Sequence, residues 1–160
     1  MLSRTTEYAL RAVVFLARGE GDNTTAQRIA EVTGVPDGYM SKVLNTLARA
    51  GVVISQRGPT GGFTLASPAG RLTMLDVVEA VEPLPRIKTC PLALAEHAGA
   101  LCPLHSVLAS LVDEAARRLA ETTIADLIVA PIAPPGGCEF PPRCMQPTVD
   151  RVPGGHGAKA

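Results

Sequence analysis

Residues 25–65 of this 160-residue chain have the sequence TAQRIAEVTGVPDGYMSKVLNTLARAGVVISQRGPTGGFTL. Apolar residues recur at helical spacing over the first part of this stretch, which predicts two helices. Thr25 can cap the first helix, because its hydroxyl can accept a hydrogen bond from a free backbone amide. Gly34 can end that helix in the left-handed conformation, and Pro36 fixes a backbone angle that suits the start of the next. The short connection between the two helices predicts a helix-turn-helix.

A glycine-rich hairpin follows the second predicted helix. Val52–Ser55 and Phe63–Leu65 have the composition of short strands, and GPTGG, residues 58–62, favours a turn between them. This order is that of a winged helix-turn-helix, which places one helix in the major groove of DNA. We therefore predict a mainly α fold with a small β-hairpin wing that binds DNA. The alternative is a helix pair that serves only for packing.

The second predicted helix has a polar face that suits DNA. Met40, Val43, Leu44 and Leu47 recur at helical spacing and predict a buried face, so the polar residues between them point outward. Hydroxyl, amide and cationic side chains contact phosphates and base edges, and a wing can carry a cation to a phosphate or to the minor groove. The candidate DNA-binding residues are Thr25, Tyr39, Ser41, Lys42, Arg57, Gly58 and Gly61.

The charges of the chain are unevenly distributed. The formal net charge is zero, but residues 1–71 carry eight Lys/Arg and five Asp/Glu, a net of +3, and residues 72–160 carry seven and ten, a net of −3. A basic excess on the helix-turn-helix half is what a DNA-facing half requires, and two subunits acting together would double it.

No catalytic, secretory or membrane-spanning motif is evident in the sequence. The residues RGPTGG resemble a phosphate-binding loop, but no Gly-Lys-Ser/Thr follows, and neither a nucleophile elbow nor a zinc-hydrolase motif occurs. No apolar run approaches the roughly 20 residues that a membrane span needs. We therefore expect a cytoplasmic protein that is not an enzyme and does not bind a membrane, and whose four cysteines are thiols or metal ligands rather than disulfides.

A long amphipathic helix is expected from about Leu104 to Glu121. Its apolar stripe is too long for a small domain to cover, so we interpret it as a dimerisation helix; the alternative is that the chain's own first helix covers it. Shorter helices are expected at Leu72–Val81 and Thr122–Ile128. These elements divide the chain into a DNA-binding domain (1–82), a sensor loop with the dimerisation helix (83–130), and a tail rich in Pro and Gly that we expect to be disordered (131–160). The stripe comprises Val107, Leu108, Leu111, Val112, Ala115 and Leu119.

Two cysteines and two histidines lie close together before the long helix. Cys90, His97, Cys102 and His105 have the spacing C-x6-H-x4-C-x2-H. Thiolate sulfur and imidazole nitrogen suit an iron–sulfur cluster or zinc, although this is not the spacing of a zinc finger. The alternative is scattered thiols and a histidine that only caps a helix. A second cysteine pair, Cys138 and Cys144, lies in the tail, where we expect two free thiols rather than further ligands.

Several segments resemble a known family. They are TEYALRAVVFLA near the start, QRIAEVTGVPDGYMSKVLNTLARAGVVIS, the wing RGPTGGFTLA, LTMLDVVEAVE, the cysteine-bearing loop and the closing ETTIADL. Together they make Met1–Val129 similar to the IscR/NsrR-type winged-helix transcriptional regulators of the Rrf family. The resemblance implies a repressor-type homodimer that is paired by a long helix and binds double-stranded DNA, with a palindromic operator expected. Better known members sense iron–sulfur status, nitric oxide or redox state through a [2Fe–2S] or [4Fe–4S] cluster.

The resemblance also implies metal ligands. Family members commonly have three cysteines in the sensing loop, and Cys90 and Cys102 match the first and the last. Glu96 stands where the middle cysteine is expected, with His97 beside it.

Two further ligands follow from the same resemblance. His105 matches a histidine that follows the last cysteine in cluster-assembly regulators, and Glu7 matches an acidic residue that reaches the cluster of the opposite subunit in nitric-oxide sensors. A mixed ligand set favours [2Fe–2S], because non-cysteine ligands are better tolerated there. The alternatives are zinc, a metal-free regulator that senses through its thiols, a cluster carrier, and a dimer that only binds other proteins.

Overall fold

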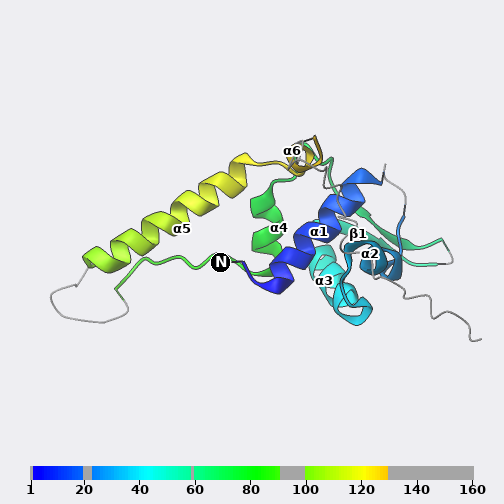
Figure 1. Ribbon diagram of the computed structural model, residues 1–160, viewed down its shortest axis with the longest axis horizontal. Helices are drawn as coiled ribbons and strands as arrows, with labels where there is room; N and C mark the ends of the chain where they lie inside the picture. Colours follow the sequence, from blue (N-terminus) through cyan, green and yellow to red (C-terminus); the bar gives the residue numbers. More distant parts are fainter. Residues whose placement is uncertain (1, 20–22, 59, 91–99, 130–160) are drawn as a thin grey trace, which may run out of the picture.

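Figure 1 shows one long helix that extends as an arm from a body formed by the other helices and the hairpin. This computed structural model describes residues 2–19, 23–58, 60–90 and 100–129. The helices and the two-stranded hairpin confirm the predicted mainly α fold with a wing. The elements are α1 (Arg4–Arg18), α2 (Ala26–Thr33), α3 (Asp37–Arg49), β1 (Val53–Gln56), β2 (Gly62–Leu65), α4 (Met74–Val81), α5 (Pro103–Glu121) and α6 (Ile124–Val129).

The helix-turn-helix forms as its local signals predict. The Thr25 hydroxyl accepts a hydrogen bond from the Arg28 amide at 3.2 Å, and Gly34 ends α2 with φ of 68°. α3 begins directly after Pro36. Both helices pack against α1, and apolar side chains of all three form most of the core, which includes Ala9, Ala12, Val13, Leu16, Ile29, Met40, Val43, Leu44 and Leu47.

The wing is attached to the start of the helix-turn-helix. β1 and β2 pair antiparallel, from Val53 opposite Leu65 to Gln56 opposite Gly62. On the other edge of β2, the Thr24 amide donates to the Phe63 carbonyl at 3.1 Å, and the Phe63 amide donates to the Thr24 carbonyl at 2.9 Å. This bridge fixes the position of the hairpin relative to α2.

Close backbone approach at Gly62 leads to a stability prediction. A Cβ atom at this position would lie 2.8 Å from backbone atoms of Thr24, closer than real contacts allow. Gly62→Ala should therefore reduce the free energy of unfolding by about 1–3 kcal/mol, as measured by chemical denaturation. The matched control is Gly70→Ala, since a Cβ there meets nothing within 4 Å. Equal stability of the two variants would contradict this account of the wing.

The C-terminal end of α5 is attached to the body. The Met74 amide donates to the Thr122 carbonyl at 2.9 Å, and the Ile124 amide donates to the Leu72 carbonyl at 2.8 Å. Ile124 is fully buried in the core, and α6 packs against α1. Thr73, with Asp76, caps α4 at the same place through a reciprocal pair of hydrogen bonds. These contacts hold α6 and the C-terminal end of α5 in place.

The chain itself covers the apolar stripe of α5 only in part. Val112 and Leu119 are half-buried, and the main neighbour of α5 among the described elements is α4. Ala115 is exposed, and Leu111 is 61% exposed. One edge of the predicted stripe therefore packs within the single chain, against α4, and the alternative that the first helix covers the stripe is wrong. The rest of the stripe forms an uncovered face in the single chain, which includes Leu104, Val107, Leu108 and Leu111.

Charged side chains along the second half of α5 pair with one another. Glu114 accepts hydrogen bonds from Arg117 and Arg118, and Arg117 also donates to Glu121. The hydrogen bonds from Arg117, followed by those from Arg118, lower the pKa of Glu114 to about 2. These pairs lie within one helix, so they support α5 without a second chain.

None of the described helices combines the length and the apolar character that crossing a bilayer requires.

Candidate functional site

A cleft of about 780 Å³ lies between α3 and the wing. Polar positions of α3 form one wall, and residues at the end of β1 form the other. Asn45, Thr46 and Arg49 follow Lys42 by three, four and seven residues, so these four side chains form one polar stripe of α3 along this wall. The lining residues are Lys42, Asn45, Thr46, Ala48, Arg49, Ser55 and Arg57.

Three cations converge on this cleft. Lys42, Arg49 and Arg57 are exposed, and no carboxylate of the described residues forms an ion pair with any of them. Arg49 has only a long contact, 3.4 Å, from its guanidinium to the Thr46 hydroxyl. Unpaired cations beside hydroxyl and amide groups suit phosphate oxygens and base edges. The cleft therefore presents groups that suit contact with nucleic acid.

The predicted DNA-binding residues do not all meet at this cleft. Lys42 and Arg57 line the cleft. Thr25 instead caps α2, and Ser41, the residue before Lys42, is half-buried. Tyr39 contacts α1 instead, at the Thr5 hydroxyl.

The two wing glycines of the prediction shape the turn. Gly58 has φ of 123°, a conformation that side chains disfavour, and its carbonyl accepts a hydrogen bond from the Gly61 amide at 2.9 Å. Four polar residues of the cleft, Asn45, Thr46, Arg49 and Ser55, were not among the candidates. The helical repeat that starts at Lys42 could have identified the first three.

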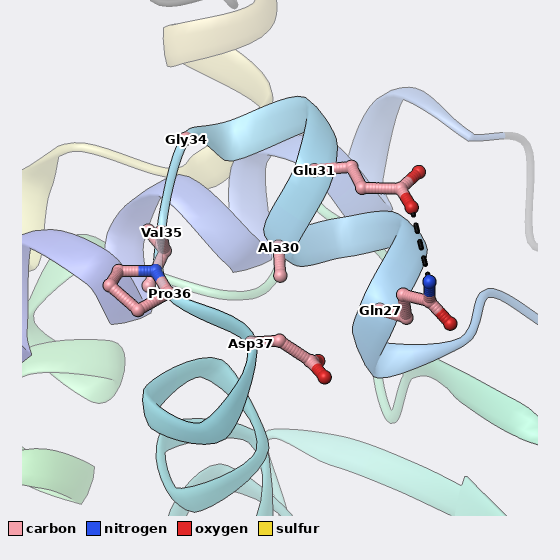
Figure 2. A pocket seen from close by; sticks show the side chains of 7 residues that line it. All are labelled: Gln27, Ala30, Glu31, Gly34, Val35, Pro36 and Asp37. Carbon is pink, nitrogen blue, oxygen red and sulfur yellow. Dashed lines mark hydrogen bonds between the residues drawn. The ribbon is translucent and has the colours of Figure 1, made fainter. Parts of the chain in front are cut away.

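A second hollow, of about 460 Å³, lies at the turn between α2 and α3. Figure 2 shows the Gln27–Glu31 pair on one side and Asp37 on the other. The Gln27 amide donates to the Glu31 carboxylate at 3.3 Å. The lining residues include two carboxylates and no cation, which is unfavourable for phosphate. This hollow therefore suits an anion less well than the cleft between α3 and the wing does.

The described cysteines and a histidine meet at the start of α5. Cys90, Cys102 and His105 place their Sγ and ring nitrogen atoms within 4.8 Å of one another. Cys102 is the N-cap residue of α5, so His105 lies one turn away on the same side of the helix. The His105 Nδ1 atom lies 3.1 Å from Cys102 Sγ and 3.6 Å from Cys90 Sγ. Figure 1 shows that this end of α5 projects away from the body.

The environment of Cys102 favours its thiolate. Hydrogen bonding from the His105 backbone, followed by hydrogen bonding with its ring, lowers the pKa of the Cys102 thiol to about 7. The residue itself is buried, at 8% exposure. Thiolates and neutral imidazoles are the forms that bind transition metals, so this group can hold a metal ion or one side of a cluster.

Glu7, the other predicted ligand that the structure describes, does not lie at this group within one chain. Glu7 lies on α1, is half exposed, and pairs with Arg11. His97 and Glu96 fall in residues 91–99, outside the described part of the chain, as do Cys138 and Cys144 in residues 130–160. Cys90, Cys102 and His105 are therefore the donor set that the described structure supplies.

Comparison with solved structures identifies the same architecture in regulators. CymR (YrzC), the global cysteine regulator of B. subtilis, has 25% identity and a TM-score of 0.65 over 80% of this chain and 95% of its own. T. potens IscR has 25% identity and a TM-score of 0.65 over 80% of this chain and 85% of its own. Staphylococcus aureus CymR, at 24% identity, matches with a TM-score of 0.63 over 80% and 98% of the two chains.

The sequence model of the Rrf2 family, described as iron-dependent transcriptional regulator, matches residues 2–130. This match covers the helix-turn-helix, the wing, the cysteine-bearing segment and the arm. Proteins of this kind regulate transcription by binding DNA and are not enzymes. The chain therefore belongs to the Rrf2 family of transcriptional regulators.

Proposed function

We propose that this chain is a homodimeric, repressor-type regulator in the cytoplasm that binds a palindromic operator and senses redox state, nitric oxide or iron–sulfur status through a [2Fe–2S] cluster. Residues 1–82 would bind DNA, and residues 83–130 would carry sensing and pairing. The observation that carries the sensing part is the group Cys90, Cys102 and His105, whose donor atoms lie within 4.8 Å of one another.

The chemistry of the residues present fits an iron–sulfur cluster, for which they supply three of four ligands. Cysteine sulfur is the usual ligand of such clusters, and imidazole replaces it in some [2Fe–2S] centres. This chain supplies two thiols and one imidazole, so one position is left for His97 or for Glu7 of the partner subunit. When bound, the cluster would supply one-electron redox chemistry and reactivity toward nitric oxide. The family description, iron-dependent, supports iron over zinc.

The pairing part of the proposal rests on the uncovered face of α5. Leu104, Val107 and Leu111 are each about 60% exposed on one face of this helix. An apolar face of this kind on a long helix is typical of association with another chain. The neighbouring charges are already paired within α5, so they do not compete for a partner.

The test of the sensing proposal is anaerobic purification of the full chain. Visible absorption with iron and acid-labile sulfide assays should give about two of each per subunit if each holds a [2Fe–2S] cluster. Affinity for DNA should then differ between this protein and the same protein after iron removal by a chelator. Protein that takes up zinc alone, or that shows equal affinity in both forms, would contradict the cluster-sensing proposal.

A metal-free thiol sensor is the second candidate, because the Cys90 and Cys102 sulfurs lie close enough to be joined after a small movement. Hydrogen peroxide would take two electrons and two protons from the two thiols, which gives one disulfide and two molecules of water. Mass spectrometry of peroxide-treated, iron-free protein distinguishes this candidate. A loss of two mass units that Cys90→Ala prevents would favour it.

DNA contact through the cleft leads to a further prediction. Lys42→Ala and Arg57→Ala should each weaken binding to an operator duplex by about 1–3 kcal/mol if the side chain reads a base, and should reduce the salt slope by about one if it contacts a phosphate. Arg118→Ala is the charge-matched control, because Arg118 pairs with Glu114 on α5. Unchanged affinity of both cleft variants at physiological salt would contradict this docking.

A further inference from the structure

Tyr39 belongs to the first turn of α3, but α1 holds its side chain. The Tyr39 hydroxyl lies 2.6 Å from the Thr5 hydroxyl, across 34 positions of sequence. Its ring meets the ring of Tyr8 edge to face, with centroids 5.5 Å apart and an interplanar angle of 82°. A short hydroxyl contact and an aromatic pair therefore join the start of the proposed recognition helix to α1.

The first turn of α3 lacks the support that other helices of the body have. The hydroxyls of Ser3, Thr25 and Thr73 cap α1, α2 and α4 through hydrogen bonds to backbone amides. Pro36 precedes α3 and offers no such bond, and Gly38 adds no side chain to this turn. The Tyr39 amide instead donates to the Pro36 carbonyl at 2.9 Å. First turns without a side-chain cap fray more readily than capped ones. The contacts of Tyr39 supply from α1 a support that the local sequence does not.

α1 also contacts the other side of the helix-turn-helix connection. The Arg11 guanidinium donates to the Thr33 carbonyl at the end of α2, at 3.4 Å, and lies 5.9 Å from the centroid of the Tyr8 ring. Tyr8 and Arg11 are one turn apart, so they share a face of α1. This face therefore contacts the last residue of α2 and the first turn of α3.

We propose that Tyr39 is a positioning residue for operator recognition. Its hydroxyl, through Thr5, orients the first turn of α3 relative to α1 and thereby sets the angle at which the polar stripe of α3 meets the base edges. The Tyr39 hydroxyl acts on DNA through this geometry rather than by reading a base. The inference requires DNA binding, which is a property of the family, and it does not require a metal.

The test is a double-mutant cycle in the full-length protein. The probe is a duplex of about 30 base pairs that the wild-type protein enriches from a random pool, compared with a scrambled duplex of equal composition. Tyr39→Phe and Thr5→Val should each weaken binding to the enriched duplex about fivefold, the value for one lost hydrogen bond. Binding to the scrambled duplex should not change, and the double variant should be no weaker than either single variant.

Two further measurements separate positioning from a general loss of structure. Thr5→Ser keeps the hydroxyl and should retain wild-type affinity. Hydrogen exchange of the amides of residues 37–40 without DNA should be faster in Tyr39→Phe and in Thr5→Val, while the melting temperature changes little. Wild-type affinity of Thr5→Val, effects that multiply in the double variant, or unchanged exchange would each overturn the proposal.

Discussion

Cys102→Ala is expected to yield folded protein without bound iron or acid-labile sulfide. The Cys102 sulfur lies 3.1 Å from His105 Nδ1 at the start of α5, so its loss removes the central donor of the group. The remaining thiol of Cys90 and the imidazole of His105 are too few ligands for a cluster that needs four. The measurement is iron and sulfide content after anaerobic reconstitution, with circular dichroism to show that the helices persist.

The tail provides a matched control for this loss. The double variant Cys138→Ala/Cys144→Ala also loses two thiols, but neither is a proposed ligand. The iron content of this variant should therefore match that of the wild type. His105→Ala should lower iron content or shift the visible spectrum, because another group must take its position. Full iron and sulfide in Cys102→Ala would show that the cluster is not held at this group.

Leu111→Glu is expected to convert the dimer into monomers. Leu111 is 61% exposed in the single chain and lies in the uncovered apolar face of α5. In a dimer paired through this face, a carboxylate at this position would be desolvated without a partner. An uncompensated buried charge costs about 3–5 kcal/mol, so the dissociation constant should rise by more than about a hundredfold. Sedimentation equilibrium measures the change directly, and binding to a palindromic duplex should be lost with it.

Ile54→Glu is the control for the dimer prediction. Ile54 is also a large apolar residue, 48% exposed, but it lies on β1 rather than on α5. This variant should remain dimeric, which separates loss of the α5 face from a general effect of an added charge. A Leu111→Glu variant that sediments as a dimer would place the interface on another surface.

Features that depend on neighbouring residues were predictable from the sequence. Thr25 and Thr73 cap helices, and Gly34 ends one, because each needs only a few adjacent backbone groups. The i, i+3 relation of Cys102 and His105 likewise brings them together once α5 begins at Pro103. The buried face of α3 followed from the spacing of its apolar residues.

Features that depend on distant segments could not be read from the sequence. The pattern of α5 shows that Val112 and Leu108 are apolar, but only the packing of α4 decides that the first is half-buried and the second exposed. The same holds for Tyr39, which has an outward position in the helical repeat but meets Thr5 across 34 positions. Periodicity reports which side chains share a face, whereas the fold decides what covers that face.

The attachment of α5 at one end has a mechanical consequence. Backbone hydrogen bonds at Thr122 and Ile124 hold the C-terminal end of the helix against the body, and Cys102 lies at the opposite end. A helix of 19 residues is about 28 Å long, so it acts as a lever with its pivot at α6. A tilt of about 5° at the pivot would move the far end by about 2.5 Å. Small rearrangements at the bridge between Thr73 and Thr123 would therefore be amplified at the cysteines, and forces applied at the cysteines would return to the body with the same leverage.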